Sequence, residues 1–164
     1  MQANPSGPEI AIARVIQVND AGEKNALYEN KPTRFDALCM HRDDVLVTGQ
    51  GVSVLSSNAH CAVQAVVAKT QDIHFWGVQY HPELHFNDIA SFLKRSDIEG
   101  FSQTAEAIGL NAPAGLSKED IIAYFQCLNK EGDEAALKAR YGLSQTILSR
   151  PVHECKLSNW LASF

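Results

Sequence analysis

Several features that would point to a particular kind of protein are missing from this sequence of 164 residues. It has four cysteines but no C-x-x-C pair, so neither a zinc site nor a disulfide framework is indicated. No apolar run approaches the roughly 18 residues of a membrane span, and the first residues lack the charged-then-apolar pattern of a signal peptide. The formal net charge is -5, without the basic stripe that phosphate binding needs. These absences predict a cytoplasmic protein with reduced thiols that binds neither nucleic acid nor membrane.

What the sequence does contain is typical of a globular chain with a real core. It is 45% hydrophobic and 20% charged, which at this length predicts one domain, or one domain with an appendage.

Short strand patterns fill the first eighty residues. The run from Ile10 to Val18 is apolar on both faces for much of its length, and turn residues separate the later runs. The expected strands are residues 10–18, 35–40, 45–47, 52–55, 61–68 and 73–80. Such dense packing of short strands predicts a largely antiparallel sheet, with the last two strands forming a hairpin.

Helical patterns replace the strands after this point. Asn87 is the expected N-cap of a helix that ends near Arg95, and Ser117 with Asp120 has the form of a capping box. Further helical segments are expected at 133–141, 144–148 and 156–161. We therefore predict two parts, residues 1–95 with the strands and residues 96–164 as a helical C-terminal extension.

One stretch of the chain carries residues suited to proton chemistry. An apolar strand ends at Tyr80, and His81-Pro82-Glu83 follows it. Side chains two apart in extended backbone point to the same side about 7 Å apart, so the carboxylate of Glu83 can orient the imidazole of His81. Such a pair forms two thirds of a nucleophilic triad. On spacing alone, two ordinary surface residues are the competing interpretation.

Residues 77–83, Gly-Val-Gln-Tyr-His-Pro-Glu, resemble the signature of class I (triad) glutamine amidotransferases. Residues 40–45, Met-His-Arg-Asp-Asp-Val, are similar to the H-x-D-x-V loop of that family, and residues 51–58 are similar to one of its strands. Residues 4–10 resemble the corresponding segment in the branch similar to the amidotransferase part of GMP synthase. The resemblance spans roughly residues 4 to 95 and is weak over the helical tail.

The resemblance implies a fold, a substrate and a set of site residues. The fold would be α/β, part of a flavodoxin-like doubly wound domain with a largely antiparallel section. His81 would be the base and Glu83 the orienting acid, while His41, Arg42 and Asp43 would border the glutamine pocket, through backbone groups more than side chains. Glutamine would be hydrolysed without a cofactor, and the ammonia would pass to another domain or subunit that accepts it.

The nucleophile of this family is a cysteine in a G-x-C-x-G turn, and this sequence contains no such turn. Cys39 and Cys61 begin or lie within apolar strands, so we expect them to be buried and inert. The chain therefore resembles the carboxyl half of the domain, inactive without the cysteine segment. A half-domain would expose an apolar sheet face, so we expect a homo-oligomer, swapped elements, or pairing with the missing half.

Two alternatives to catalysis by this triad stay open at this point. The chain could be a truncated or degenerate module that binds a partner without catalysis. A metal-dependent hydrolase is suggested by six histidines and by the order His81-Pro82-Glu83-Leu84-His85. Pro82 disfavours that alternative, because the H-E-x-x-H arrangement needs both histidines on one helical face.

Overall fold

The computed structural model describes residues 1–46, 50–72, 74–95, 117–128 and 142–163. The strands are β1 (Gln2–Ala3), β2 (Glu9–Val18), β3 (Arg34–His41), β4 (Asp43–Asp44), β5 (Val52–Ser57), β6 (Ala65–Lys69) and β7 (His74–Val78). The helices are α1 (Asp20–Glu23), the 3-10 helix η1 (Ala26–Tyr28), α2 (Phe86–Arg95), α3 (Lys118–Cys127), α5 (Gln145–Leu148) and α6 (Arg150–Leu161).

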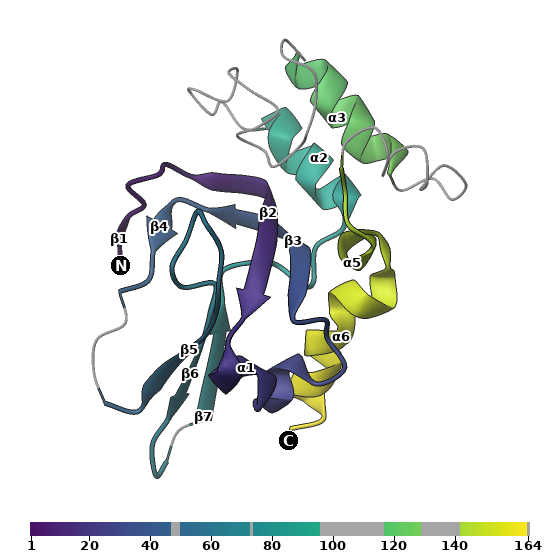
Figure 1. Cartoon of the computed structure of the whole chain (residues 1–164). Coiled ribbons are helices and arrows are strands. Elements are labelled where there is room, and N and C mark those ends of the chain that lie inside the picture. The colour runs from purple at the N-terminus through teal and green to yellow at the C-terminus, as the bar shows by residue number, and fades with distance from the viewer. Residues whose placement is uncertain (47–49, 73, 96–116, 129–141, 164) are drawn as a thin grey trace.

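A five-stranded sheet forms the main layer of the molecule (Figure 1). Its strand order is β3-β2-β5-β6-β7, and every neighbouring pair is antiparallel. The expected hairpin is present, with Lys69 of β6 opposite His74 of β7. A separate pair, β1 with β4, lies at the amino-terminal edge. The α/β class and the antiparallel strand section predicted from the sequence are both confirmed.

The strand β2 pairs with β3 along most of its length and with β5 at its end, and a bulge interrupts its pairing with β3. The register with β3 shifts between Ala13 and Ile16, and Val15 takes a positive φ of 52°. A bulge leaves a backbone N–H without its ladder partner. Asp36 of β3 supplies one: the carboxylate accepts from the Val15 amide at 2.8 Å and from the Arg14 guanidinium at 2.8 Å.

The sheet curls back on itself beyond β7. Tyr80 forms an antiparallel bridge with Cys39 of β3, and the His81 amide donates to the Leu38 carbonyl at 2.7 Å. The end of the last strand is thereby hydrogen-bonded to the first strand of the sheet order. This contact fixes the position of His81 relative to β3.

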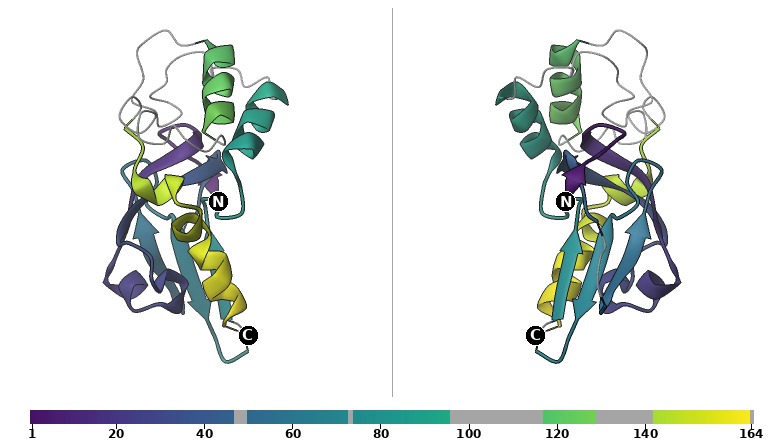
Figure 2. Two further views of the ribbon diagram at one scale, coloured as in Figure 1. Left: turned by 90° about the vertical axis from the view of Figure 1, so that its right-hand side faces the viewer. Right: turned by 90° about the vertical axis from the view of Figure 1, so that its left-hand side faces the viewer.

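Two hydrophobic clusters lie on either side of the β2–β3 pair. In one, Phe125 of α3 and other residues of α2, α3 and α5 pack against Ile12 of β2 and Leu38 of β3. In the other, Ile16, Phe35, Leu55 and Tyr80 pack with η1. Figure 2 shows α2 and α3 together at one end of the molecule and α6 running beside the strands. The burial of these side chains drives the association of helices and sheet.

The C-terminal helices contact the sheet part directly. Lys31 donates to the Val152 carbonyl of α6, and Asn159 of α6 donates to the Leu27 carbonyl of η1 at 3.1 Å. The amide of Asp36 donates to Thr146 of α5 at 3.0 Å. The division at residue 95 stays a prediction, but these helices are not isolated from residues 1–95.

Several local predictions need correction. The helix α2 begins at Phe86, so Asn87 lies inside its first turn, and Asp88 accepts from the His85 amide at 2.7 Å. The short strand falls at Asp43–Asp44, while Val45 and Leu46 are not in a strand. The capping box of Ser117 and Asp120 is confirmed. The helix expected at 133–141 lies outside the described residues.

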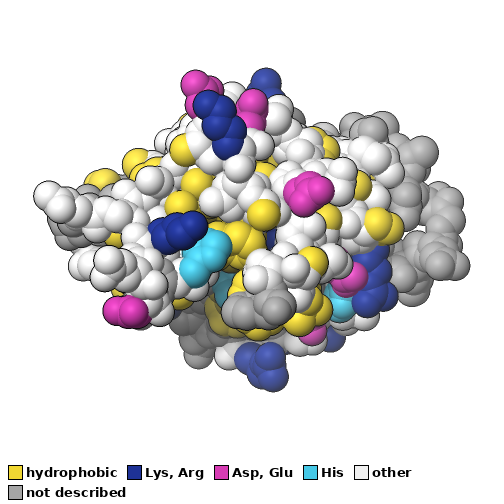
Figure 3. All heavy atoms as spheres, turned by 90° about the horizontal axis from the view of Figure 1, so that it is seen from below, with side chains coloured by type: hydrophobic (Ala, Val, Ile, Leu, Met, Phe, Trp, Pro, Cys, Tyr) yellow, Lys and Arg dark blue, Asp and Glu magenta, His cyan; other side chains and the backbone are white. Residues whose placement is uncertain are grey.

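Large hydrophobic side chains are exposed at several positions. Phe75 of β7 is 55% exposed, and Trp160 and Leu161 at the end of α6 are 48% and 66% exposed. Seen from below, the molecule has hydrophobic atoms gathered around a hollow in its surface (Figure 3). Among the described residues, no helix is both long enough and apolar enough to cross a membrane.

Candidate active site

The His81 and Glu83 side chains contact each other where the sheet returns to β3. The backbone of His81 is held by the Leu38 carbonyl, and Pro82 is buried beside it. Proline fixes φ and has no amide hydrogen, so the strand cannot continue through it. The chain turns at this residue, and the Leu84 amide donates back to the His81 carbonyl at 3.4 Å.

The geometry of this pair is that of an oriented imidazole. Nδ1 of His81 lies 2.7 Å from Oε1 of Glu83, and the two side chains are 35% and 52% exposed. Nε2 of His81 has no hydrogen-bond partner within the described parts of the chain. When Nδ1–H donates to the carboxylate, Nε2 carries the lone pair that can accept a proton. The imidazole of His81 is therefore held by the carboxylate of Glu83, and both side chains are partly exposed to solvent.

Gln79, two residues before His81, connects this strand end to the loop of residues 41–44. Its backbone amide donates to the Gln64 carbonyl at 2.9 Å. Its side-chain amide donates to the Asp43 carbonyl at 2.8 Å. Two of the regions that the sequence singled out, 41–43 and 81–83, are thus joined through one glutamine.

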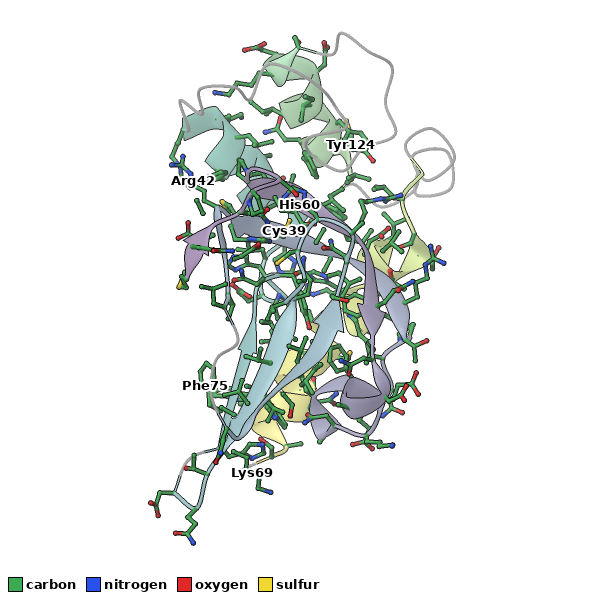
Figure 4. All side chains as sticks on the ribbon, turned by 60° about the vertical axis from the view of Figure 1, so that its left-hand side comes forward. Cys39, Arg42, His60, Lys69, Phe75 and Tyr124 are labelled. Atoms are coloured by element: carbon green, nitrogen blue, oxygen red, sulfur yellow. The ribbon has the colours of Figure 1, made fainter. Side chains whose placement is uncertain are left out.

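The three residues proposed to border a glutamine pocket differ in placement. His41 is turned inward: its side chain is 8% exposed and Nε2 lies 2.9 Å from Oε2 of Glu9. Burial alone lowers the pKa of His41, but the hydrogen bond and charge of Glu9, the Asp43 carbonyl and Asp44 together raise it. Arg42 is exposed at the edge of the molecule (Figure 4), and Asp43 is half-buried. The His41 imidazole accordingly faces the interior and Arg42 is exposed, while the Arg42 and Asp43 carbonyls accept hydrogen bonds from the Asn4 amide and the Gln79 side chain.

Sequence reasoning missed a buried polar cluster behind this loop. Glu9 is 6% exposed and accepts from Asn58 at 2.6 Å and from Gln64 at 2.6 Å. His60 is half-buried, and its Nε2 is 3.0 Å from the Gly7 carbonyl. The only sequence signal was a glutamate at the start of a strongly apolar strand, which is uncommon because a buried carboxylate needs partners.

All four cysteines are free, and Cys39 and Cys61 are buried. Burial raises the pKa of the Cys39 thiol well above its usual value. Burial also raises that of Cys61 to about 12. None of the four cysteines, all within the described residues, hydrogen-bonds to His81. A thiol with a raised pKa carries little thiolate at neutral pH and is a poor nucleophile.

His85, the second histidine of residues 81–85, does not face Glu83. Nε2 of His85 lies 3.8 Å from Oε1 of Glu154 on α6, whereas His81 faces Glu83. No set of three His, Cys, Asp or Glu side chains in the described part of the chain is grouped as metal ligands would be.

Comparison with known proteins identifies a family and relatives that this chain resembles. The family model described as glutamine amidotransferase class-I matches residues 8–96. A Pseudomonas gamma-glutamyl-L-1-hydroxyisopropylamide hydrolase is 31% identical over 128 residues, covering 71% of this chain and 43% of that protein. A glutamine-hydrolyzing GMP synthase subunit from Methanocaldococcus jannaschii is 37% identical over 76 residues, covering 46% of this chain and 37% of its own length.

A solved structure resembles the whole fold. The crystal structure of SMU.1228c has a TM-score of 0.58 and 13% sequence identity, covering 98% of this chain and 54% of that one. This likeness concerns the fold alone. The chain spans less than half the length of both curated relatives.

Proposed function

Because the chain belongs to the class-I glutamine amidotransferase family, we propose that it carries the base and orienting acid of a site that hydrolyses the side-chain amide of glutamine. The observation that supports this most is the 2.7 Å contact between Nδ1 of His81 and Oε1 of Glu83, with Nε2 left open. In this proposal His81 transfers the protons, and Glu83 holds its tautomer and stabilises the imidazolium.

The proposed reaction needs a thiolate that these 164 residues do not supply in a G-x-C-x-G turn. The thiolate attacks the amide carbon, and the imidazolium of His81 gives its proton to the departing ammonia, leaving a thioester. Neutral His81 then takes a proton from water, whose oxygen attacks the thioester. The intermediate then expels the thiolate, and glutamate leaves after its carboxyl proton passes to solvent, so that the thiolate–imidazolium pair is restored.

The glutamine would lie between His81 and the loop of residues 41–43. The inward turn of the His41 imidazole suggests that the loop acts through backbone groups, with Arg42 and Asp43 at the open side. Ammonia would pass to another domain or subunit that accepts it, as the similarity to the GMP synthase subunit of Methanocaldococcus jannaschii suggests. The Pseudomonas relative suggests that other gamma-glutamyl amides are candidate substrates as well.

A non-catalytic binding module is the second candidate. The raised pKa values of Cys39 and Cys61 favour it, because neither thiol is suited to attack. In that case the fold would be retained for contact with a partner.

The test is ammonia release from L-glutamine by the product of the whole gene, including any residues encoded before Met1. His81→Ala should lower kcat by about 100-fold or more, because the proton donor and acceptor are lost. Glu83→Gln should lower it less, since the imidazole remains. His85→Ala, four residues on, is the matched control and should retain activity.

Two results would contradict the proposal. Activity that survives His81→Ala would remove His81 from the reaction. A folded wild-type gene product that releases no ammonia from glutamine or a gamma-glutamyl amide would favour the binding module.

A further inference from the structure

Five residues behind the candidate site form a closed ring of hydrogen bonds. Glu9 bonds to the side chain of Gln64, and the Gln64 carbonyl accepts from the Gln79 amide. The Gln79 side chain then donates to the Asp43 carbonyl. His41 closes the ring, with Nδ1 at 3.3 Å from the Asp43 carbonyl and Nε2 at 2.9 Å from Glu9.

The ring joins segments that are far apart in the sequence. Glu9 begins β2, His41 ends β3, Gln64 precedes β6 and Gln79 follows β7. The sequence separations are 55 residues for the Glu9–Gln64 bond and 36 for the Gln79–Asp43 bond. Strand pairing places Glu9 opposite His41, and a backbone hydrogen bond joins Gln79 to Gln64. The side chains of Glu9 and Gln79 add the bonds that join these two pairs to each other and to Asp43.

Glu9 is the part of the ring with the most partners. Its carboxylate is 7% exposed and accepts from Asn58, Gln64 and His41. Hydrogen bonds to a buried carboxylate are shorter and stronger than neutral ones, and removing the acceptor leaves several donors without partners. In Glu9→Gln, the amide N–H₂ group would replace one carboxylate oxygen. It would then face at least one of the three donors, Asn58, Gln64 and His41, without an acceptor between them.

The ring also favours the charged form of His41. Both of its nitrogens face acceptors, Glu9 on one side and the Asp43 carbonyl on the other. A neutral imidazole can donate from only one nitrogen, whereas the imidazolium donates from both. The surrounding titratable groups are Glu9 on β2, Asp43 and Asp44 on β4, and the Cys61 thiol, which donates to Asp44 at 3.1 Å.

We propose that Glu9 is a positioning residue that sets the distance between the 41–44 loop and His81 through this ring. The inference rests on the proposed function, because it assumes that glutamine lies between that loop and His81. Gln79 lies two residues before His81 in the same segment. Its side-chain bond to the Asp43 carbonyl therefore joins the 41–44 loop to the segment that carries the imidazole.

The first experiment measures the ring itself by NMR on the purified gene product. In the wild type the pKa of His41 should lie above its ordinary value, and the side-chain amide of Gln79 should exchange slowly. Glu9→Gln should lower the pKa of His41 and speed the exchange at Gln79. Asp36→Asn is the matched control: Asp36 is equally buried and pairs with Arg14 outside the ring, so it should change neither quantity.

The second experiment separates positioning from general stability. Glu9→Gln should raise the KM for glutamine about tenfold with a smaller change in kcat, whereas loss of His81 acts on kcat. Gln79 is half-buried, and Gln79→Met removes only its bond to the Asp43 carbonyl. This variant should also raise the KM for glutamine about tenfold. It tests the ring even if Glu9→Gln does not fold. Asp36→Asn should leave KM unchanged.

The outcomes distinguish this inference from the proposed function. A wild type that hydrolyses glutamine with a KM unaffected by both ring variants overturns the positioning role and leaves the function standing. An unchanged His41 pKa and unchanged Gln79 exchange in Glu9→Gln overturn the ring, whatever the activity. Absence of glutamine hydrolysis in the wild type overturns the proposed function, while the NMR measurements still decide whether Glu9 holds the loop.

Discussion

Lys156 carries an amine from α6 into the aromatic core. Its Nζ lies 3.5 Å from the ring centre of Tyr80, 4.1 Å from that of Phe35 and 4.9 Å from that of Tyr28. The residue is 2% exposed, and Nζ has no hydrogen-bond partner in the described part of the chain. Burial, and then the charge of Lys31, lower the pKa of Lys156 well below its usual range. Cation–π contacts favour the charged form, but they do not replace lost hydration.

We expect Lys156→Met to stabilise the protein by about 1–3 kcal/mol at pH 7, because an apolar side chain of similar length replaces a desolvated amine. The folded-state pKa is lowered, so the unfolded chain binds a proton as pH falls below the usual 10.5 while the folded chain does not. Wild-type stability should therefore fall from pH 10 toward neutral, and the variant should flatten this dependence.

The measurement is urea unfolding at pH 7 and pH 9. Lys24→Met, on the exposed surface, is the control and should change the free energy of unfolding by less than about 0.5 kcal/mol. A Lys156→Met variant less stable than the wild type at pH 7 would mean that the amine has partners which outweigh its desolvation.

Single residues also mark the limit of what the sequence could predict. The His81–Glu83 contact was predictable because the two residues are only two apart in the sequence, although a turn at Pro82, and not extended backbone, brings the side chains to 2.7 Å. The partners of Glu9 were not, because Asn58 and Gln64 are 49 and 55 residues away and nothing in local spacing encodes such pairs. The candidate site residues were thus easier to find than the residues packed behind them.

At the scale of elements, α1 lies against β5 through a glycine. Asn19 caps this helix by accepting from the Gly22 amide at 2.9 Å. A Cβ at Gly22 would overlap the Leu55 carbonyl oxygen and a methyl group of Val18. The Leu55 carbonyl oxygen belongs to the backbone and cannot move aside like the end of a flexible side chain, so only glycine allows this approach.

Gly22→Ala should therefore lower the free energy of unfolding by about 1–3 kcal/mol, since the helix must move away from β5. Thermal unfolding followed by circular dichroism measures the change. Glu23→Ala, exposed in the same helix, should shift the melting temperature little. An unaltered melting temperature in Gly22→Ala would show that α1 can shift freely on the sheet.

Elements with strong patterns were predictable and those made by tertiary contacts were not. The apolar run at Ile10 to Val18 lies in β2, where propensity and burial agree. The hairpin expected at residues 61–80 is present as the shorter strands β6 (Ala65–Lys69) and β7 (His74–Val78). The short strand at Asp43–Asp44 exists through pairing with Gln2 and Ala3, which outweighs the low strand propensity of aspartate. The bulge at Val15 likewise depends on Asp36, a partner from another strand.

At the scale of the whole molecule, apolar surface remains exposed at the end that holds β7 and the last turn of α6. Phe75, Trp160 and Leu161 are the exposed large hydrophobic residues of those two elements. Contiguous apolar patches are uncommon on monomers and mark contact surfaces. The expectation of a homo-oligomer, or of pairing with a further segment of the domain, stays a prediction.

We expect the 18.0 kDa chain to scatter light as a species larger than a monomer at micromolar concentration. Phe75→Ser should shift the mass toward that of a monomer, because it removes apolar contact area. Lys69→Ser, on the neighbouring strand β6, is the control. A compact wild-type monomer across the concentration range would contradict the expected association.

The bridge between Tyr80 and Cys39 ties the candidate base to a fixed frame. Successive side chains of a strand face opposite sides, so a slip of one position along β3 would send the His81 imidazole to the wrong side of the sheet. Deleting or inserting a single amino acid between Val78 and Pro82 would do the same. The length of that short connection is thus as strict a requirement as the identity of the histidine it delivers.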